Sequence, residues 1–131
     1  MNKRLMITLA LLALVLLAAF GEYFTLNKVF GNIGTEAAAL KTEMLADPEK
    51  IDTDSLINKI ENLEDYWLKR KPLASVMINQ ILLMEYTAIM GRLKTNIKIN
   101  EYPMAQVEVD NLLRQTFELK ELHKPVLKNI F

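Results

Sequence analysis

The chain has 131 residues, its sixteen basic side chains balance sixteen acidic ones, and it contains no cysteine. A net charge of zero creates no field that could gather nucleic acid, so we expect no nucleic-acid partner. Without cysteine the chain can form neither a disulfide framework nor a thiolate metal site.

An uncharged stretch runs from Leu5 to Gly21, and its only polar side chain is Thr8. As a helix it would span about 25 Å at roughly 1.5 Å per residue, close to the lower limit for crossing the hydrocarbon core of a bilayer. Lys3 and Arg4 precede it, and basic residues favour the cytoplasmic side. We therefore predict a lipid-bilayer anchor through Leu5 to Gly21 in the cell membrane, with the N-terminus in the cytoplasm and the C-terminal domain outside.

A cleaved export signal has the same basic start and apolar core. Signal cleavage requires small residues three and one before the cut, and only Ala19 with Gly21 fits this pattern. Apolar residues then continue at helical spacing, where a signal peptide usually gives way to polar chain. The residues favour an uncleaved signal anchor and leave a secreted protein with a cleaved signal as the alternative.

These features divide the chain into three parts. They are a cytoplasmic N-terminus (1–4), a transmembrane anchor (5–24) and an extracytoplasmic helical domain (25–131). Roughly 110 residues outside the anchor are enough for one small core and too few for two domains.

Apolar residues continue past the anchor at alternating steps of four and three, which predicts that its helix extends outward. They are Leu26, Phe30, Ile33, Ala37, Leu40 and Met44. We interpret Gly31 and Gly34 as sites of close helix packing in preference to a bend, although each costs about 1 kcal/mol in a helix interior. Asp47-Pro48 should end this helix, because the residue before a proline avoids the helical conformation.

A second helix is predicted to start near Thr53 or Asp54, either of which can cap it. Its apolar stripe consists of Leu56, Ile60, Leu63 and Trp67. Pro72 suits the first turn of a following helix, so Lys71-Pro72 is interpreted as a tight connection between helices.

The third predicted helix, from about Leu73 to Ile99, is the most apolar part of the outer domain. We expect it to be covered on more than one side and to be the central element. Asn79, Gln80 and Glu85 lie in its middle, which argues against a second membrane span.

A fourth helix should begin around Asn100 to Pro103 and stop at Lys124-Pro125, after which an apolar tail folds back onto the bundle. Its expected inward residues are Ala105, Val109, Leu112, Leu113, Thr116, Phe117 and Leu119, and its expected outward residues are Glu108, Asp110, Arg114, Glu118 and Lys120. The predicted fold class is all-α, with an N-terminal transmembrane helix that continues into an up-and-down bundle of about four helices.

Residues able to carry catalysis are scarce. The sole histidine is His123, beside ordinary surface carboxylates, and the sequence has no nucleophile paired with a base, no phosphate loop and no metal-binding motif. We therefore predict that the protein is not an enzyme, and that it takes no cofactor and no metal.

Three residues are candidates for contact with a ligand or partner, namely Trp67, Glu85 and Met84. If Glu85 were buried among apolar neighbours, it could line a pocket. We favour the alternative that it lies on an exposed strip with Arg92. Trp67 is expected in the core, with its indole N–H bonded to an oxygen.

The layout of the chain resembles that of one known family. A short basic start, one apolar anchor, a helical outer domain with Trp67 near its middle, a very apolar central helix and the ending Leu127-Lys128-Asn129-Ile130-Phe131 carry this resemblance over nearly the whole chain. These features resemble the domain of unknown function 4363 family, small membrane-anchored proteins of Firmicute bacteria. The resemblance implies a membrane location and a helical fold, and no activity.

Two functional hypotheses follow. In the first, the anchored domain works at the cell envelope through protein contact, with a groove or the stripe from Leu26 to Met44 engaging a partner or a second copy. In the second, the bundle senses a small molecule held between the helices near Glu85 and Trp67.

Overall fold

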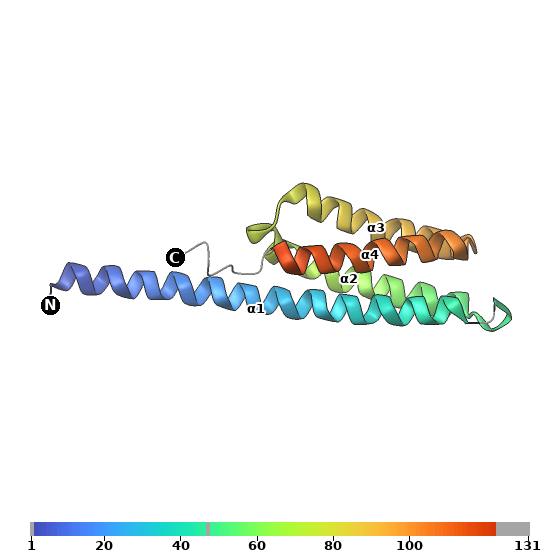
Figure 1. The fold of residues 1–131 in the computed structure, drawn as a ribbon, viewed down its shortest axis with the longest axis horizontal. Helices are drawn as coiled ribbons and strands as arrows, with labels where there is room; N and C mark the ends of the chain where they lie inside the picture. The colour runs from blue at the N-terminus through green and yellow to red at the C-terminus, as the bar shows by residue number, and fades with distance from the viewer. Residues whose placement is uncertain (1, 47, 123–131) are drawn as a thin grey trace.

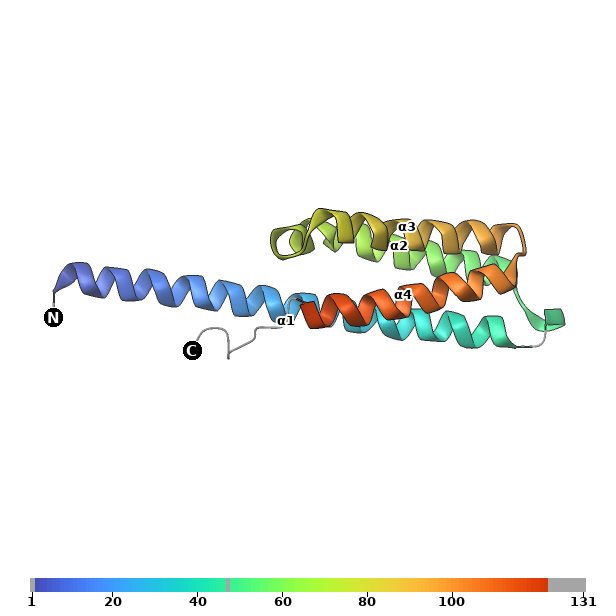
Figure 2. The same ribbon diagram turned by 45° about the horizontal axis from the view of Figure 1, so that its top comes forward.

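The computed structural model describes residues 2–46 and 48–122, which fold into four α-helices (Figure 1). The helices are α1 (Lys3–Leu45), α2 (Thr53–Met77), α3 (Gln80–Lys98) and α4 (Tyr102–Leu122), with a single 3-10 turn at Pro48–Lys50 between α1 and α2. Successive helices run in opposite directions, so the second half of α1 and the other three helices form an up-and-down bundle (Figures 1 and 2). The predicted fold class is confirmed.

Helix α1 is one continuous helix of 43 residues, and its two halves have different surroundings. The N-terminal half extends beyond the bundle and is long and apolar enough to cross a membrane, and its most apolar window is covered by no other part of the described chain (Figure 1). The C-terminal half forms one wall of the bundle. Its buried side chains are the six predicted ones and Val29. The predicted continuation of the anchor helix is therefore confirmed, and α1 ends at Leu45, just before the expected stop.

Close packing does not explain the two glycines of this segment. A Cβ atom added at Gly31 would meet nothing within 4 Å, and one at Gly34 would meet the Thr116 methyl at 3.7 Å, an ordinary contact. The helix passes through both positions without a break. The interpretation of these glycines as packing sites is therefore not supported.

The four helices form a ring in which α1 and α3 each pack against α2 and α4 (Figure 2). The prediction that the third helix is the central element is wrong, because α3 occupies one corner of this ring. Its side chains Ile81 and Met84 are 74% and 58% exposed. A four-helix ring leaves an outer face on every member, so the excess apolar residues of α3 are not covered.

The predicted boundary between the second and third helices is also wrong. Helix α2 continues through Pro72 to Met77, and α3 begins only at Gln80. The chain turns at Ile78, whose backbone is extended, and at Asn79, whose side-chain oxygen accepts a hydrogen bond from the Ile81 amide at 2.8 Å. Asn79 thus caps the start of α3, and the apolar residues on both sides of it hide this signal in the sequence.

Helix α2 starts at the predicted residue with a different cap. Asp52 accepts a hydrogen bond from the Ser55 amide at 3.1 Å, so the cap is Asp52 and not Thr53 or Asp54. Thr53 instead bonds with its side chain to Asn100 and Tyr102, which joins the start of α2 to the α3–α4 connection.

The core is built from the inner faces of all four helices, and α4 departs from its predicted pattern at two positions. Phe117 is 65% exposed and Glu108 only 8% exposed, the reverse of the expectation. Glu108 lies three residues after Ala105 and four before Leu112, which places it on the buried stripe. Phe117 lies one residue past that stripe and points outward, and Leu113 is partly buried.

The predictions for His123, the Lys124-Pro125 stop and the apolar tail fall on residues 123–131, outside the described residues. The same holds for Asp47.

The position of Pro72 inside α2 gives a test of the corrected boundary. Proline has no N–H for the helix ladder, so we expect Pro72→Ala to stabilise the protein by about 2 kcal/mol, after allowing for the greater freedom of the unfolded chain. Thermal unfolding of the full chain in mild detergent, followed by circular dichroism, measures this change. Pro103→Ala is the matched control, because Pro103 lies in the first turn of α4 and should change little. Equal effects of the two variants would contradict the continuous α2.

Candidate functional site

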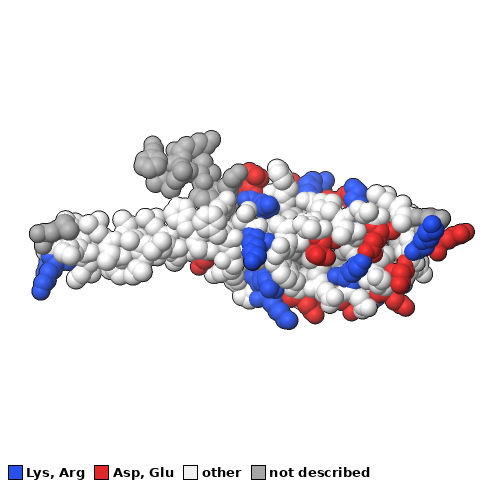
Figure 3. Space-filling model, turned by 90° about the horizontal axis from the view of Figure 1, so that it is seen from below, with Lys and Arg blue, Asp and Glu red and all other residues white. Residues whose placement is uncertain are grey.

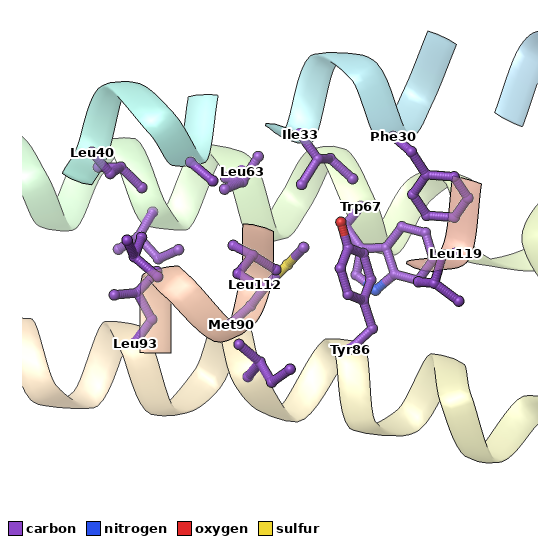
Figure 4. Close-up of a cluster of buried hydrophobic side chains, with 14 of the residues drawn as sticks. Phe30, Ile33, Leu40, Leu63, Trp67, Tyr86, Met90, Leu93, Leu112 and Leu119 are labelled. Atoms are coloured by element: carbon purple, nitrogen blue, oxygen red, sulfur yellow. The ribbon is translucent and has the colours of Figure 1, made fainter. Parts of the chain in front are cut away.

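Three aromatic rings from three helices meet in the half of the bundle next to the apolar N-terminal half of α1. Trp67 of α2 lies 4.9 Å from Tyr86 of α3 and 5.9 Å from Phe30 of α1 between ring centroids, and Phe30 lies 5.8 Å from Tyr86 (Figure 4). All three side chains are fully buried. Trp67 is therefore a core residue and is not accessible to a partner.

The polar atoms of this cluster are satisfied by threonines. The Trp67 indole donates to Thr87 Oγ1 at 2.9 Å, as expected for a buried indole. Tyr86 and Thr116 share a hydrogen bond of 2.6 Å, and the Thr116 hydroxyl donates its own hydrogen to the Leu112 carbonyl. Tyr86 must therefore be the donor in that pair, since a threonine has one hydroxyl hydrogen.

Burial raises the pKa of Tyr86 above its ordinary value, and the Thr116 hydrogen bond opposes only part of this rise. The phenol is held in its neutral form by the apolar surroundings, and a buried phenolate would lack a compensating charge. This arrangement favours a structural role for Tyr86.

The structure does not bring the three candidate contact residues together. Glu85 and Met84 lie on the outer face of α3, whereas Trp67 points into the core. Glu85 Oε1 accepts a hydrogen bond from Arg92 Nη2 at 3.1 Å, which places Glu85 on the exposed strip with Arg92. A ligand held between the helices by Glu85 and Trp67 has no support in this arrangement.

A polar cluster that the sequence did not reveal lies between α3 and α4. The Arg92 Nε atom donates to Glu108 Oε1 at 3.1 Å, and no described group donates to the buried Glu108 Oε2. The hydrogen bonds to Glu85 and Glu108 raise the pKa of Arg92 above its ordinary value. The cluster borders an open hollow of about 600 Å³, which Lys94, Asn96 and Met104 also line. The signal for Glu108 was its place on the buried stripe of α4.

A second hollow, of about 380 Å³, follows the groove between α1 and α2. Asn32 Nδ2 donates to Tyr66 Oη at 2.8 Å across this groove. The Arg70 guanidinium lies over the Tyr66 ring at 3.7 Å. Glu36, Lys59, Asn62 and Leu63 also line the hollow. Tyrosine and arginine are enriched in protein interfaces, so this α1–α2 groove is the candidate contact surface.

The stripe from Leu26 to Met44 is not available to a partner. Its side chains are at most 3% exposed, because they form the α1 part of the core. The hypothesis that this stripe binds a second copy is therefore wrong.

Among residues 2–46 and 48–122, no group of three His, Asp or Glu side chains is placed to hold a metal ion. A scan against protein-family models finds no matching family, and searches of the curated proteins and of the solved structures find no match.

The Tyr86 phenol gives a pH-dependent prediction. At neutral pH we expect Tyr86→Phe to lower the free energy of unfolding by about 1 kcal/mol, through loss of the Thr116 hydrogen bond. Above about pH 10 the unfolded parent releases this proton while the folded parent keeps it, so folding loses stability as pH rises. The advantage of the parent over the variant should therefore shrink between about pH 8 and about pH 11.

Unfolding of both proteins by denaturant across that range measures the difference. An advantage that stays constant or grows above about pH 10 would contradict a raised pKa for Tyr86.

Proposed function

We propose that this protein is a single-pass, membrane-anchored helical domain that works at the cell envelope through protein contact, with the N-terminus in the cytoplasm and the bundle outside. The observation that supports anchoring is the free N-terminal half of α1, an apolar helix that no other part of the described chain covers. A helix satisfies its own backbone hydrogen bonds, so this segment is stable in lipid and costly to leave in water. The membrane location implied by the resemblance to the domain of unknown function 4363 family agrees with this proposal.

The orientation follows from charge. Lys3 and Arg4 flank the start of the apolar segment, while Glu22 follows its end and Lys28 is the first basic residue beyond it. The side with more flanking basic residues is retained in the cytoplasm. A signal sequence has the same length and composition, so cleavage and secretion is the competing outcome for this segment.

The α1–α2 groove is the contact surface of this proposal. Its side chains lie on two helices, and one of these is the anchor helix itself, so the groove has a fixed height above the membrane. The Tyr66 ring, held between Asn32 and Arg70, supplies a rigid amphipathic contact at little cost in conformational entropy.

A photoreactive residue in the groove tests anchoring and contact together. We expect Asn62→benzoylphenylalanine in the full chain to crosslink to one discrete protein in native membranes. The same residue in place of Arg114, on the outer face of α4, is the matched control and should not crosslink to that protein.

Adding Leu12→Arg places a charge in the apolar segment at a cost of roughly 3 kcal/mol for insertion, and should remove both membrane retention and the adduct.

Intact mass measurement of the purified natural chain separates the two fates of the apolar segment. A chain that begins at Glu22 would establish cleavage and overturn the anchor. A bundle that resists protease added to intact cells would overturn the outside location. Equal adducts from the groove and from the control position would remove the groove as the contact surface.

The second candidate function is binding of a small polar ligand in the hollow between α3 and α4. The observation that favours it is the Glu108 carboxylate, which lines the hollow and whose buried Oε2 has no described donor, so a shift of this side chain would let it accept a hydrogen bond from an ammonium group. The proposed ligand would lie in a surface hollow lined by Arg92 and Glu108, and not between the helices beside Trp67, as the sequence suggested.

Thermal unfolding of the full chain with and without spermidine tests this candidate. Ligand binding would raise the unfolding temperature of the parent, and Glu108→Gln should abolish the rise because it removes the negative charge that attracts the ligand. Glu85→Gln is the control, since Glu85 is exposed and bonded only to the outer side of Arg92, and it should retain most of the rise. No rise in the parent, or an equal rise in both variants, would count against the Glu108 site.

A further inference from the structure

The two ends of the bundle differ sharply in polarity. From Pro72 to Met84 no side chain is charged, and this segment contains the end of α2, the turn and the start of α3, here called the α2–α3 corner. Three of its apolar side chains are strongly exposed, Ile81 at 74%, Val76 at 68% and Met84 at 58%. The connections at the opposite end carry charges, among them Glu49, Lys50, Asp52, Lys98 and Glu101.

The α2–α3 corner lies at the end of the bundle nearest the anchor (Figures 1 and 2). Trp67 of α2 contacts Phe30 of the antiparallel α1, and Met77 at the end of α2 lies ten residues further toward the anchor. At a rise of 1.5 Å per residue this distance is about 15 Å, which brings the corner level with about Phe20. The corner therefore reaches the height at which the uncharged segment of α1 ends.

Basic side chains precede the α2–α3 corner in α2. Lys69 and Lys71 of α2 have no carboxylate within ion-pair distance among the described residues, whereas Lys41, Lys59 and Lys94 further along the bundle are all paired. Figure 3 shows Lys and Arg side chains gathered where the bundle meets the uncharged helix, and mixed charges beyond. Glu118 and Glu121 lie at the same end on α4, which is on the opposite side of the ring from α2.

We propose that the α2–α3 corner is a lipid-binding surface that rests on the same bilayer as the anchor. The exposed Val76 and Ile81 enter the interface between headgroups and acyl chains, and Lys69 and Lys71 face anionic headgroups. These lysines lie about 10 Å above the end of the uncharged segment, within one Debye length of the membrane surface. The inference rests on the proposed anchoring of α1, which holds the corner at the membrane.

Site-specific fluorescence in reconstituted bilayers tests the corner. The chain has no cysteine, so Ile81→Cys, Glu101→Cys and Leu12→Cys each create a single site for an environment-sensitive dye. The full chain is placed, one copy per nanodisc, in phosphatidylcholine with and without phosphatidylglycerol. Some of the lipids carry a nitroxide quencher just below the headgroup. We expect several-fold stronger quenching at Ile81→Cys than at the far-end control Glu101→Cys.

The Leu12→Cys dye separates the two proposals. Its emission and its quenching by nitroxides deeper in the acyl chain report whether the anchor is in lipid. An anchored Leu12→Cys with an unquenched Ile81→Cys overturns the corner and leaves the anchor standing, whereas an aqueous Leu12→Cys overturns the anchor. A shielded but unquenched dye at Ile81→Cys would show that protein covers the corner, which also overturns lipid as the occupant.

A separate comparison tests whether anionic headgroups contribute to binding of the corner. Phosphatidylglycerol should increase quenching at Ile81→Cys, and the double substitution Lys69→Gln with Lys71→Gln should return it to the level seen in phosphatidylcholine alone. Arg70 is left unchanged because it packs on Tyr66. Quenching that does not depend on phosphatidylglycerol would overturn the role of the lysines.

Discussion

The structure depends on a single helix, α1, whose N-terminal half is uncovered and whose C-terminal half packs in the bundle. From Leu5 to Gly21 α1 exposes apolar side chains around its whole circumference, and from Leu26 onward it buries a single stripe against α2 and α4. The backbone hydrogen bonds of a helix are internal and serve equally well in lipid and in a protein core. Only the side chains have to change between the two halves, so the chain needs no loop between the uncovered half of α1 and the bundle.

The largest buried side chains lie close to the point where α1 leaves the bundle. Phe30, Trp67 and Tyr86 join α1, α2 and α3 there, and Thr116 Oγ1 of α4 accepts a hydrogen bond from the Tyr86 hydroxyl. Each polar group of the cluster thus has a partner, which avoids the cost of an unsatisfied group in an apolar site. Side-chain contacts thus join all four helices at the end of the bundle where α1 leaves it.

Much of the fold could be predicted from the sequence, because helical periodicity reports burial wherever a helix has one inner face. The stripes of α1 and α2, including Trp67, follow this rule. Helical periodicity does not predict the start of α3, because apolar residues surround that helix near the turn and conceal the Asn79 cap. Pro72 is a second exception, because α2 tolerates this proline in its interior. Residue type is a poorer guide to burial than position on the helix at two places in α4, because Glu108 is buried and Phe117 is exposed. The α1–α2 groove could not be foreseen, since it depends on how two helices lie together.

The unbroken helix also fixes the rotational position of the bundle around the axis of α1, relative to the apolar N-terminal half of that helix. Each residue of an α-helix advances the chain by about 100° around the axis, and α1 contains no joint between the two parts that could absorb a change. A single-residue insertion near Tyr23 would therefore turn the bundle by more than a quarter of a revolution. In the anchored arrangement proposed above, the direction in the membrane plane toward which each face of the bundle points is therefore set by the number of residues between the anchor and the bundle.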